Sequence, residues 1–284
     1  MITEHGIYSR EREAEIIKSD WAKGDFKSVW IAYFYHLARM AYDAADHVYT
    51  LFELNANIER ELGCAPEKIS IVPNGIHMER FASVPKLEDH GGPITIGAVV
   101  RVVPIKDIVT LLRAFFLVQQ ELPDAKLYVM GNLEEDPEYV DLVRRTAKTL
   151  HVKNVTFTGS INVAEYLPRM DILVLSSISE GQPLSVLEGF AAHRPYVTTD
   201  VGCCRELIFG DSRDTLGTAG AVVAPMDYEA LGEEIVRLAR DFALRRDMAD
   251  VGYERAKKYY TYEQFIEAYK NIYAQERELG KEAR

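Results

Sequence analysis

The chain has 284 residues, 48% of them hydrophobic and 27% charged, a balance typical of a globular protein with room for one large domain or one and a half ordinary ones. Its formal net charge of -11 argues against a nucleic-acid-binding surface and against an anionic membrane as the main partner. With three cysteines, two of them adjacent, and neither a signal peptide nor a long apolar run, we expect a cytoplasmic protein without a disulfide framework or a zinc site.

The first 75 residues predict short strands that alternate with helices. We expect strands at 1–5, 47–51 and 68–72, and helices at 8–19, 26–45 and 52–62. This segment is too short for a complete Rossmann domain and begins directly on a strand, so we expect that part of its domain is missing upstream. A linker rich in small and charged residues follows at 82–93, and we place the first domain boundary there, with residues 1–82 as the first domain.

From residue 94 to about 260, apolar runs alternate with amphipathic stretches. We expect strands at 94–101, 126–131, 154–158, 171–176, 195–200 and 220–224, and helices at 107–121, 137–150, 162–169, 183–193 and 227–241. Continuous apolar strands that alternate with helices indicate a parallel sheet covered on both faces. The fold class is therefore α/β, with a doubly wound, Rossmann-like domain at 83–260. The tail at 243–278 is also predicted helical, and its tyrosines favour packing against a neighbouring domain, with residues 261–284 as a C-terminal helix.

Polar residues follow the first two strands of this sheet. Arg101 and Lys106 are separated by a short loop, and two such cations can grip a diphosphate, although the same spacing fits a solvated basic turn. Gly131 and Asn132 end the next strand, where a glycine permits close backbone approach to a flat ring or simply forms a turn. Both groups are candidates because ligands of doubly wound folds bind at the carboxyl ends of strands.

Two glutamates flank the start of the helix expected at 183–193. Glu180 lies in the loop before Pro183, and Glu188 falls within the second turn. The free N–H groups at a helix N-terminus, near Leu184, bind phosphate well, and a carboxylate one turn further on can accept hydrogen bonds from a ribose diol. The alternative is an acidic surface helix without a ligand.

His5 ends the first strand, where it can hydrogen-bond a sugar hydroxyl or assist proton movement, or can be structural. The sequence contains no G-x-x-x-x-G-K-[ST] loop, no G-x-S-x-G elbow and no Asp-x-Asp pair that would hold a metal on a nucleotide diphosphate. We therefore expect no metal and no other cofactor. The charge of a diphosphate would be offset by Arg101, Lys106 and the helix end.

These motifs, in this order, resemble the retaining GT-B glycosyltransferases of the family that includes glycogen and sucrose synthases. The matching runs are VPNGI at 72–76, RVVPIKD at 101–107, the glycine after KLYVM, SEGQPLSVLEG at 179–189 and TTDVGCCREL at 198–207. The runs TEHGIYSRERE at 3–13 and AYDAADHVYTLFE at 41–53, together with the tryptophan-containing helix between them, resemble more closely the PelF-type enzymes of Pel exopolysaccharide assembly.

The resemblance implies a role for each candidate residue. Arg101 and Lys106 would hold the diphosphate of a sugar nucleotide, and Glu188 would bind the ribose hydroxyls. Glu180 and His5 would be the catalytic pair, with both side chains reaching the donor sugar. The implied donor-binding set is Arg101, Lys106, Gly131, Asn132, Gln182, Leu184 and Glu188.

By the same resemblance, the donor is a UDP-sugar, with glucose as the sugar, and it is a substrate and not a cofactor. The acceptor is a growing exopolysaccharide or a sugar, and the setting is a membrane-associated polysaccharide-synthesis complex. GT-B enzymes have a full N-terminal Rossmann domain, of which residues 1–82 represent only the last portion. We therefore expect exposed apolar surface on residues 1–80 and on the C-terminal helix, which would favour a homodimer.

Two other functions remain open from the sequence. The first is a non-catalytic module that binds a sugar nucleotide or a partner without turnover. The second is a GT-B enzyme of another reaction, such as an epimerase or a phosphorylase, although no lysine context suggests a pyridoxal phosphate site.

Overall fold

The computed structural model describes residues 1–18, 25–211 and 214–282. The chain forms two compact units, one made of Met1–Asn74 and Ala268–Arg284, the other of Gly75–Glu267. The division falls between Asn74 and Gly75, whereas the boundary expected from composition lies at residues 82–83. The division into domains 1–82, 83–260 and 261–284 stays a prediction. Ser19 of the helix expected at 8–19, and residues 283–284 of the C-terminal helix, lie outside the described residues.

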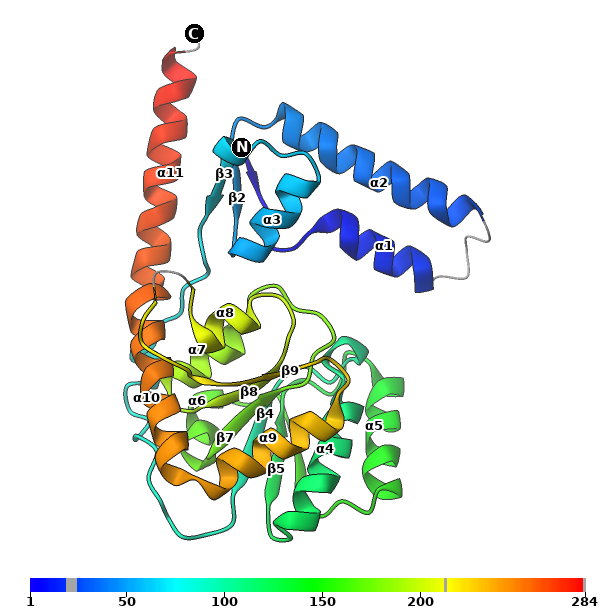
Figure 1. Ribbon diagram of the computed structural model, residues 1–284, viewed down its shortest axis with the longest axis vertical. Coiled ribbons are helices and arrows are strands. Elements are labelled where there is room, and N and C mark those ends of the chain that lie inside the picture. Colours follow the sequence, from blue (N-terminus) through cyan, green and yellow to red (C-terminus); the bar gives the residue numbers. More distant parts are fainter. Residues whose placement is uncertain (19–24, 212–213, 283–284) are drawn as a thin grey trace. The chain divides into compact units, whose positions relative to one another are not determined.

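The first unit is built on a small parallel sheet of strand order β1-β2-β3 (Figure 1). Its elements are β1 (Ile2–Thr3), α1 (Tyr8–Lys18), α2 (Asp25–Ala44), β2 (Val48–Thr50), α3 (Glu53–Glu61), the 3-10 turn η1 (Pro66–Lys68) and β3 (Ile69–Ile71). Its hydrophobic core consists of Ile7, Tyr42, Ala45, Val48, Ile58, Leu62 and Cys64, and the carboxyl of Glu59 is also buried in this unit. A second small cluster joins Ile272, from the C-terminal helix, to Tyr49 and Val72.

Helix α2 is amphipathic, and only one of its faces packs on this core. Tyr35, Ala38 and Tyr42 lie on the packed side. The opposite side exposes large apolar side chains at helical spacing, namely Phe26, Val29, Trp30, Tyr33, Leu37 and Met40. The expectation of exposed apolar surface on residues 1–80 is therefore confirmed. On the C-terminal helix, Tyr273 is an exposed large apolar side chain.

The second unit contains a parallel sheet with helices on both faces, so the α/β fold class is confirmed. Its strands are β4 (Thr95–Val99), β5 (Lys126–Met130), β6 (Val155–Gly159), β7 (Ile172–Leu175), β8 (Tyr196–Thr199) and β9 (Gly220–Val223). Its helices are α4 (Ile108–Glu121), α5 (Pro137–Thr149), α6 (Val163–Tyr166), α7 (Leu184–Ala191), α8 (Cys204–Phe209), α9 (Tyr228–Arg240) and α10 (Phe242–Tyr259). Short 3-10 turns occur at η2 (Met78–Phe81), η3 (Pro104–Lys106) and η4 (Leu167–Arg169). Helix α11 (Tyr262–Glu282) begins in this unit, and its part from Ala268 on belongs to the first.

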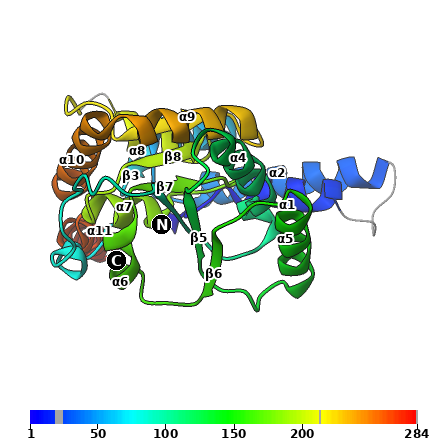
Figure 2. The same cartoon turned by 90° about the horizontal axis from the view of Figure 1, so that it is seen from below.

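The strand order of this sheet is β6-β5-β4-β7-β8-β9, and every pairing is parallel. Strand β4 is followed in sequence by its neighbour on one side, β5, while its neighbour on the other side is β7. Because crossovers between parallel strands are right-handed, this reversal places α4 on one face and α7 on the other. Figure 2 shows α4 and α9 together along one face of the strands. The reversal point between β4 and β7 is where doubly wound folds bind ligands.

Every strand and helix expected from the sequence is present, with ends shifted by a few residues. Four helices of the second unit begin at an aspartate whose side chain accepts a hydrogen bond from the first-turn backbone, namely Asp107, Asp136, Asp227 and Asp241. Two details differ from expectation. The stretch 162–169 divides into α6 and η4, and the short helix α8 was not predicted.

Among the described residues, none of the helices combines the length and the apolar character needed to span a bilayer.

Candidate functional site

Two loops meet at the reversal point of the larger sheet. One follows β4 and contains η3, and the other follows β7. The N–H of Ile178 donates to the carbonyl oxygen of Ile105 over 2.8 Å, and the Ser176 hydroxyl donates to the carbonyl oxygen of Lys106 over 2.9 Å. These hydrogen bonds join segments about 70 residues apart in sequence and fix one loop against the other.

The side chains of Lys106 and Glu180 form an ion pair across these loops. Lys106 Nζ lies 2.5 Å from Glu180 Oε1, and the Ser177 hydroxyl donates to the same oxygen over 2.6 Å. The two side chains are only 16% and 10% exposed. The structure therefore brings together the cation and the carboxylate that the sequence had assigned separately to diphosphate and sugar. Ser177 was missed, because a serine three residues before an acidic residue is too common to be a signal.

A third loop, after β8, supports the segment that leads from Glu180 to α7. The N–H of Cys203 donates to the carbonyl oxygen of Gly181 over 3.0 Å. Gly202 has a φ of +53°, and a Cβ atom at this position would lie 2.1 Å from that same carbonyl oxygen. Only glycine satisfies both demands. The sequence run that contains Gly202 was noted above, but no role was predicted for it.

Helix α7 begins next to this segment. Pro183 is its N-cap, so the N–H groups of Leu184 and Ser185 in the first turn have no intrahelical acceptor. Gln182 is buried, while Leu184 is 46% exposed. Such a helix end, four residues after the Glu180 that binds Lys106, is a favourable location for an anion.

Glu188 occupies the second turn of α7, as the sequence predicted, and is half-buried. Burial raises the pKa of its carboxyl, and the positive charge of Arg80 opposes that rise. Arg80 comes from η2, which packs against α7. The sequence offered no indication of this cation, because η2 lies more than 100 residues before α7.

Arg101 and Asn132 lie in the loops after β4 and β5, and the observed partner of each is a residue of the loop after β5. Arg101 forms an ion pair with Glu135, and both side chains are well exposed. The Asn132 side chain accepts a hydrogen bond from the N–H of Glu134 over 2.8 Å. Arg101 and Lys106 are thus bound to different carboxylates in this structure.

Gly131 is required by backbone crowding. Its φ is +157°, and a Cβ atom would lie 1.9 Å from the carbonyl oxygen of Val100. The exits of β4 and β5 approach each other at this point, which explains the glycine without reference to a ligand.

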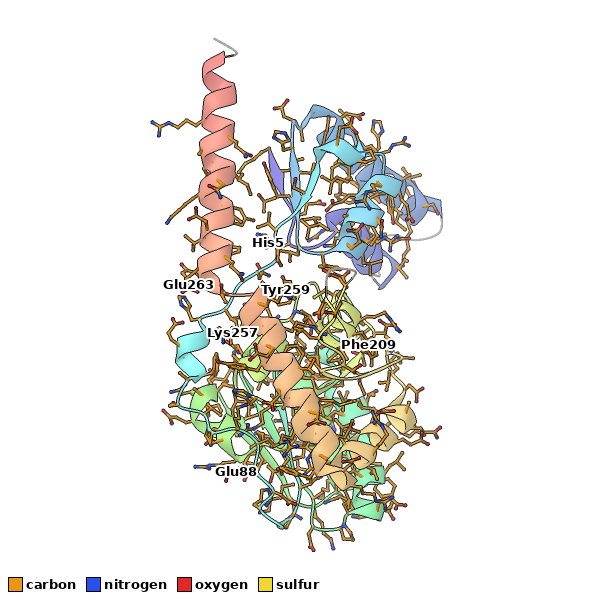
Figure 3. The ribbon with its side chains drawn as sticks, turned by 60° about the vertical axis from the view of Figure 1, so that its left-hand side comes forward. His5, Glu88, Phe209, Lys257, Tyr259 and Glu263 are labelled. Carbon is orange, nitrogen blue, oxygen red and sulfur yellow. The ribbon has the colours of Figure 1, made fainter. Side chains whose placement is uncertain are left out.

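His5 belongs to the first unit, where it lies two residues beyond the end of β1 and is exposed (Figure 3). The preceding residue is held firmly. The N–H of Glu4 donates to the carbonyl oxygen of Tyr49 over 2.9 Å, and the Tyr42 hydroxyl donates to Glu4 Oε2 over 2.8 Å.

Comparison with known proteins agrees with this arrangement. Residues 93–241, more than half of the chain, match the family described as Glycosyl transferases group 1. The chain belongs to the group 1 glycosyltransferase family. Residues 1–67 match a second family, described as a domain of unknown function (DUF3492).

Relatives and solved structures extend the match beyond the family region. N-acetyl-alpha-D-glucosaminyl L-malate synthase of Bacillus anthracis is 29% identical over 171 residues, which cover 60% of this chain and 42% of the relative. Sucrose-phosphate synthase of Thermosynechococcus elongatus superposes with a TM-score of 0.76 at 20% identity, covering 96% of this chain and 67% of that one. Anabaena Alr3699/HepE, solved with UDP and glucose, superposes with a TM-score of 0.74 at 16% identity, covering 96% of this chain and 71% of that one.

These structural neighbours confirm the expected GT-B type of fold. The chain spans less than half the length of the curated relative.

Proposed function

We propose that this chain is the donor-binding part of a retaining glycosyltransferase that uses a UDP-sugar, with glucose as the sugar. The observation that carries the proposal is the Lys106–Glu180 pair at the reversal point of the sheet, beside the N-terminus of α7. A lysine, a carboxylate and free backbone N–H groups then converge at the edge where doubly wound folds bind nucleotides. The UDP and glucose bound to the Anabaena neighbour support the choice of donor.

The proposed site balances the charge of a diphosphate without a metal ion. Lys106 uses one of its three protons on Glu180, which leaves two for phosphate oxygens. Arg101 is exposed, and it exchanges Glu135 for the diphosphate when the donor binds. The first-turn N–H groups around Leu184, together with Gln182, contribute further donors. Gly131 and Asn132 border the site from the end of β5.

Glu188 binds the ribose of the donor. A carboxylate accepts two hydrogen bonds from a diol, and here it stands one turn beyond the proposed phosphate-binding end of α7. The partial burial that raises its pKa also strengthens those hydrogen bonds, because water competes less for the carboxylate.

In the proposed reaction the bond between the anomeric carbon and the phosphate oxygen breaks, and the acceptor hydroxyl bonds to the same face of that carbon. The hydroxyl proton passes to the departing phosphate oxygen, so no protein base is consumed. Lys106 and Arg101 stabilise the negative charge that develops on the leaving diphosphate. Glu180 holds a hydroxyl of the donor sugar.

The sequence runs at 3–13 and 41–53 support a PelF-type assignment, in which the acceptor is a growing exopolysaccharide and the partners form a membrane-associated synthesis complex. The exposed apolar face of α2 supports homodimer formation through the first unit.

Calorimetric titration with UDP and UDP-glucose in EDTA tests the donor site. We expect micromolar binding by the wild-type chain. Glu188→Ala and Lys106→Ala should weaken it at least tenfold, and Glu165→Ala, an exposed change on α6, is the control. Unchanged affinity in both site variants would refute the proposal.

Transfer activity separates the two functions that remain compatible with donor binding. Release of UDP from UDP-glucose in the presence of acceptor oligosaccharides supports the transferase. Tight donor binding without any transfer by the chain favours the non-catalytic nucleotide-sugar-binding module.

A further inference from the structure

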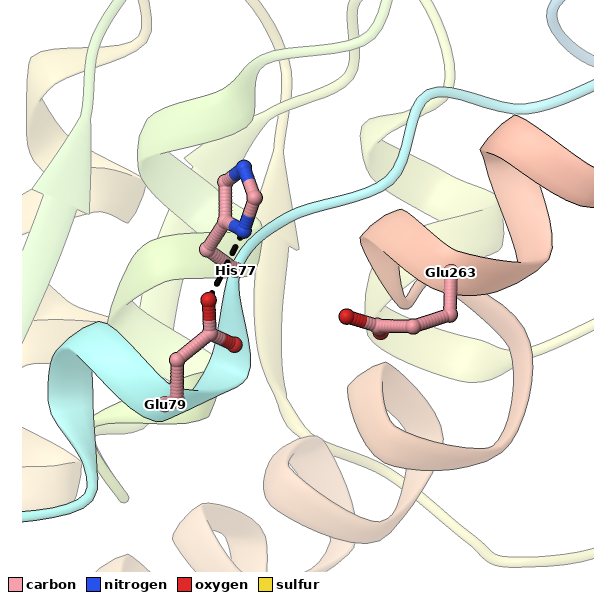
Figure 4. A group of neighbouring side chains, drawn as sticks. All are labelled: His77, Glu79 and Glu263. Atoms are coloured by element: carbon pink, nitrogen blue, oxygen red, sulfur yellow. Dashed lines mark hydrogen bonds and ion pairs between the residues drawn. The ribbon is translucent and has the colours of Figure 1, made fainter.

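Three potential metal ligands meet on the second unit, and none of them is among the residues assigned to the donor. His77 and Glu79 come from the start of η2, and Glu263 comes from the first turn of α11. His77 Nδ1 lies 2.8 Å from Glu79 Oε1, and one ligand atom from each of the three residues lies within 4.8 Å of the others. In Figure 4 the carboxylate of Glu263 points toward the gap beside the other two side chains.

The backbone that carries these ligands is fixed on both sides. Ile76 and Thr261 form a parallel bridge, with hydrogen bonds of 2.9 Å from the N–H of Ile76 to the carbonyl oxygen of Tyr260 and from the N–H of Tyr262 to that of Ile76. His77 follows the bridge by one residue and Glu263 by two. Figure 3 shows Glu263 at the start of α11, just beyond Tyr259 at the end of α10.

The imidazole is also held in orientation. Its ring stacks on that of Tyr262, with the ring centres 3.9 Å apart and the planes 29° from parallel. This contact restricts the rotation of the His77 ring, so less freedom is lost when a ligand binds it.

Distances and charges both favour a cation at this position. Zinc lies about 2.0–2.2 Å from nitrogen and oxygen ligands, so two ligand atoms on one ion stand roughly 3–4 Å apart. The three side chains need only small rotations to satisfy that spacing. Without a cation, the carboxylates of Glu79 and Glu263 face each other at short range, and like charges repel. One imidazole nitrogen and two carboxylate oxygens form a mixed set suited to a divalent transition metal.

We propose that His77, Glu79 and Glu263 bind one divalent transition-metal ion, with zinc as the representative ion, and that water completes its coordination. The ion would join η2 to the first turn of α11 and so reinforce the Ile76–Thr261 bridge. This role is structural and independent of the donor site proposed above.

Calorimetric titration of the untagged, EDTA-stripped protein with zinc chloride tests the site. We expect one saturable site per chain and a higher melting temperature with zinc than with EDTA. His77→Phe keeps a ring that can stack on Tyr262 but removes both nitrogens, and Glu263→Gln removes one charge from an exposed helical position. Each should weaken zinc binding at least tenfold. Glu267→Gln, one turn further along α11 and also exposed, should leave it unchanged.

The proposal fails if the wild type shows no saturable zinc binding, or if His77→Phe and Glu263→Gln both retain wild-type affinity. Titration of the same two variants with UDP in EDTA keeps the two proposals separate. Wild-type UDP affinity there shows that loss of zinc binding is not caused by misfolding, and failure of UDP binding by every chain would count against the donor site alone.

Discussion

Glu59 in the first unit should make folding stability fall as pH rises, and its replacement by glutamine should reduce that loss. The residue is completely buried, and neither carboxyl oxygen has a hydrogen-bond partner of good geometry. Burial is the main cause that raises the pKa of this carboxyl from 4.5 to about 8; Glu4 also raises it, while Thr50 and Arg60 act in the opposite direction.

The sign follows from proton binding. Between pH 4.5 and 8 the folded state holds a proton that the unfolded state has released, so each rise in pH within this window favours unfolding. At roughly 1.4 kcal/mol per pKa unit, the full shift corresponds to about 5 kcal/mol of stability lost above pH 8. Glu4 and Glu59 interact directly, so this loss belongs to the pair and is the most that one substitution can recover.

Urea unfolding of wild type and Glu59→Gln between pH 5 and pH 9 measures the effect. Both tryptophans of the sequence, Trp21 and Trp30, lie within Met1–Asn74, so their fluorescence reports on the unit that contains Glu59. The two proteins should have similar stability at pH 5, and the variant should be more stable by about 2–5 kcal/mol at pH 9. Glu61→Gln, on the same helix but 72% exposed, should follow the wild type at every pH. Parallel curves for wild type and Glu59→Gln would refute this reasoning.

Other substitutions test the donor site, the core and the apolar face of α2. Gly202→Ala should weaken UDP binding at least tenfold while far-UV circular dichroism is retained; Gly91→Ala, which has a similar φ of +60° but open space around it, should leave binding intact, and equal effects would exclude crowding as the cause. Asp214→Asn should lower stability by about 3–5 kcal/mol, because it leaves the charge of the buried Arg255 uncompensated, and calorimetric melting measures the loss. The double substitution Trp30→Ser and Tyr33→Ser should lower the sedimentation coefficient toward that of a monomer, because it removes two exposed rings of the proposed dimer interface on α2. An unchanged sedimentation coefficient would place the interface elsewhere.

Much of the fold followed from periodicity, because most strands of the larger sheet are apolar runs, such as Ile172–Leu175, and most of its long helices, such as Tyr228–Arg240, have an amphipathic pattern. Helix α8 was not predicted, because its six residues, Cys204–Phe209, are too few to show a helical period. The positions of Lys106, Glu180 and Glu188 at strand ends and in the second turn of α7 were predicted from the same pattern, since a strand's carboxyl end is fixed once the strand is.

The partners of these residues could not be predicted. Glu180 is 74 residues from Lys106, and Arg80 is still further from Glu188, so only the assembled fold shows which charges meet. Gly131 shows a related limit. The sequence indicated that a glycine is needed at this position, but the carbonyl oxygen of Val100, which leaves no room for a Cβ atom, lies at the end of the neighbouring strand.

The pairing of Lys106 with Glu180 bears on how the proposed donor site works. A lysine at 16% side-chain exposure would be costly to hold without a counter-ion, so Glu180 keeps the cation in place before any ligand arrives. Such a pair also limits how strongly the lysine attracts a second anion. Donor binding must therefore depend on Arg101 and the first turn of α7 as well as on Lys106. On this reasoning Glu180→Gln increases UDP affinity but not transfer, because it frees the lysine for phosphate while removing the carboxylate proposed to hold the sugar.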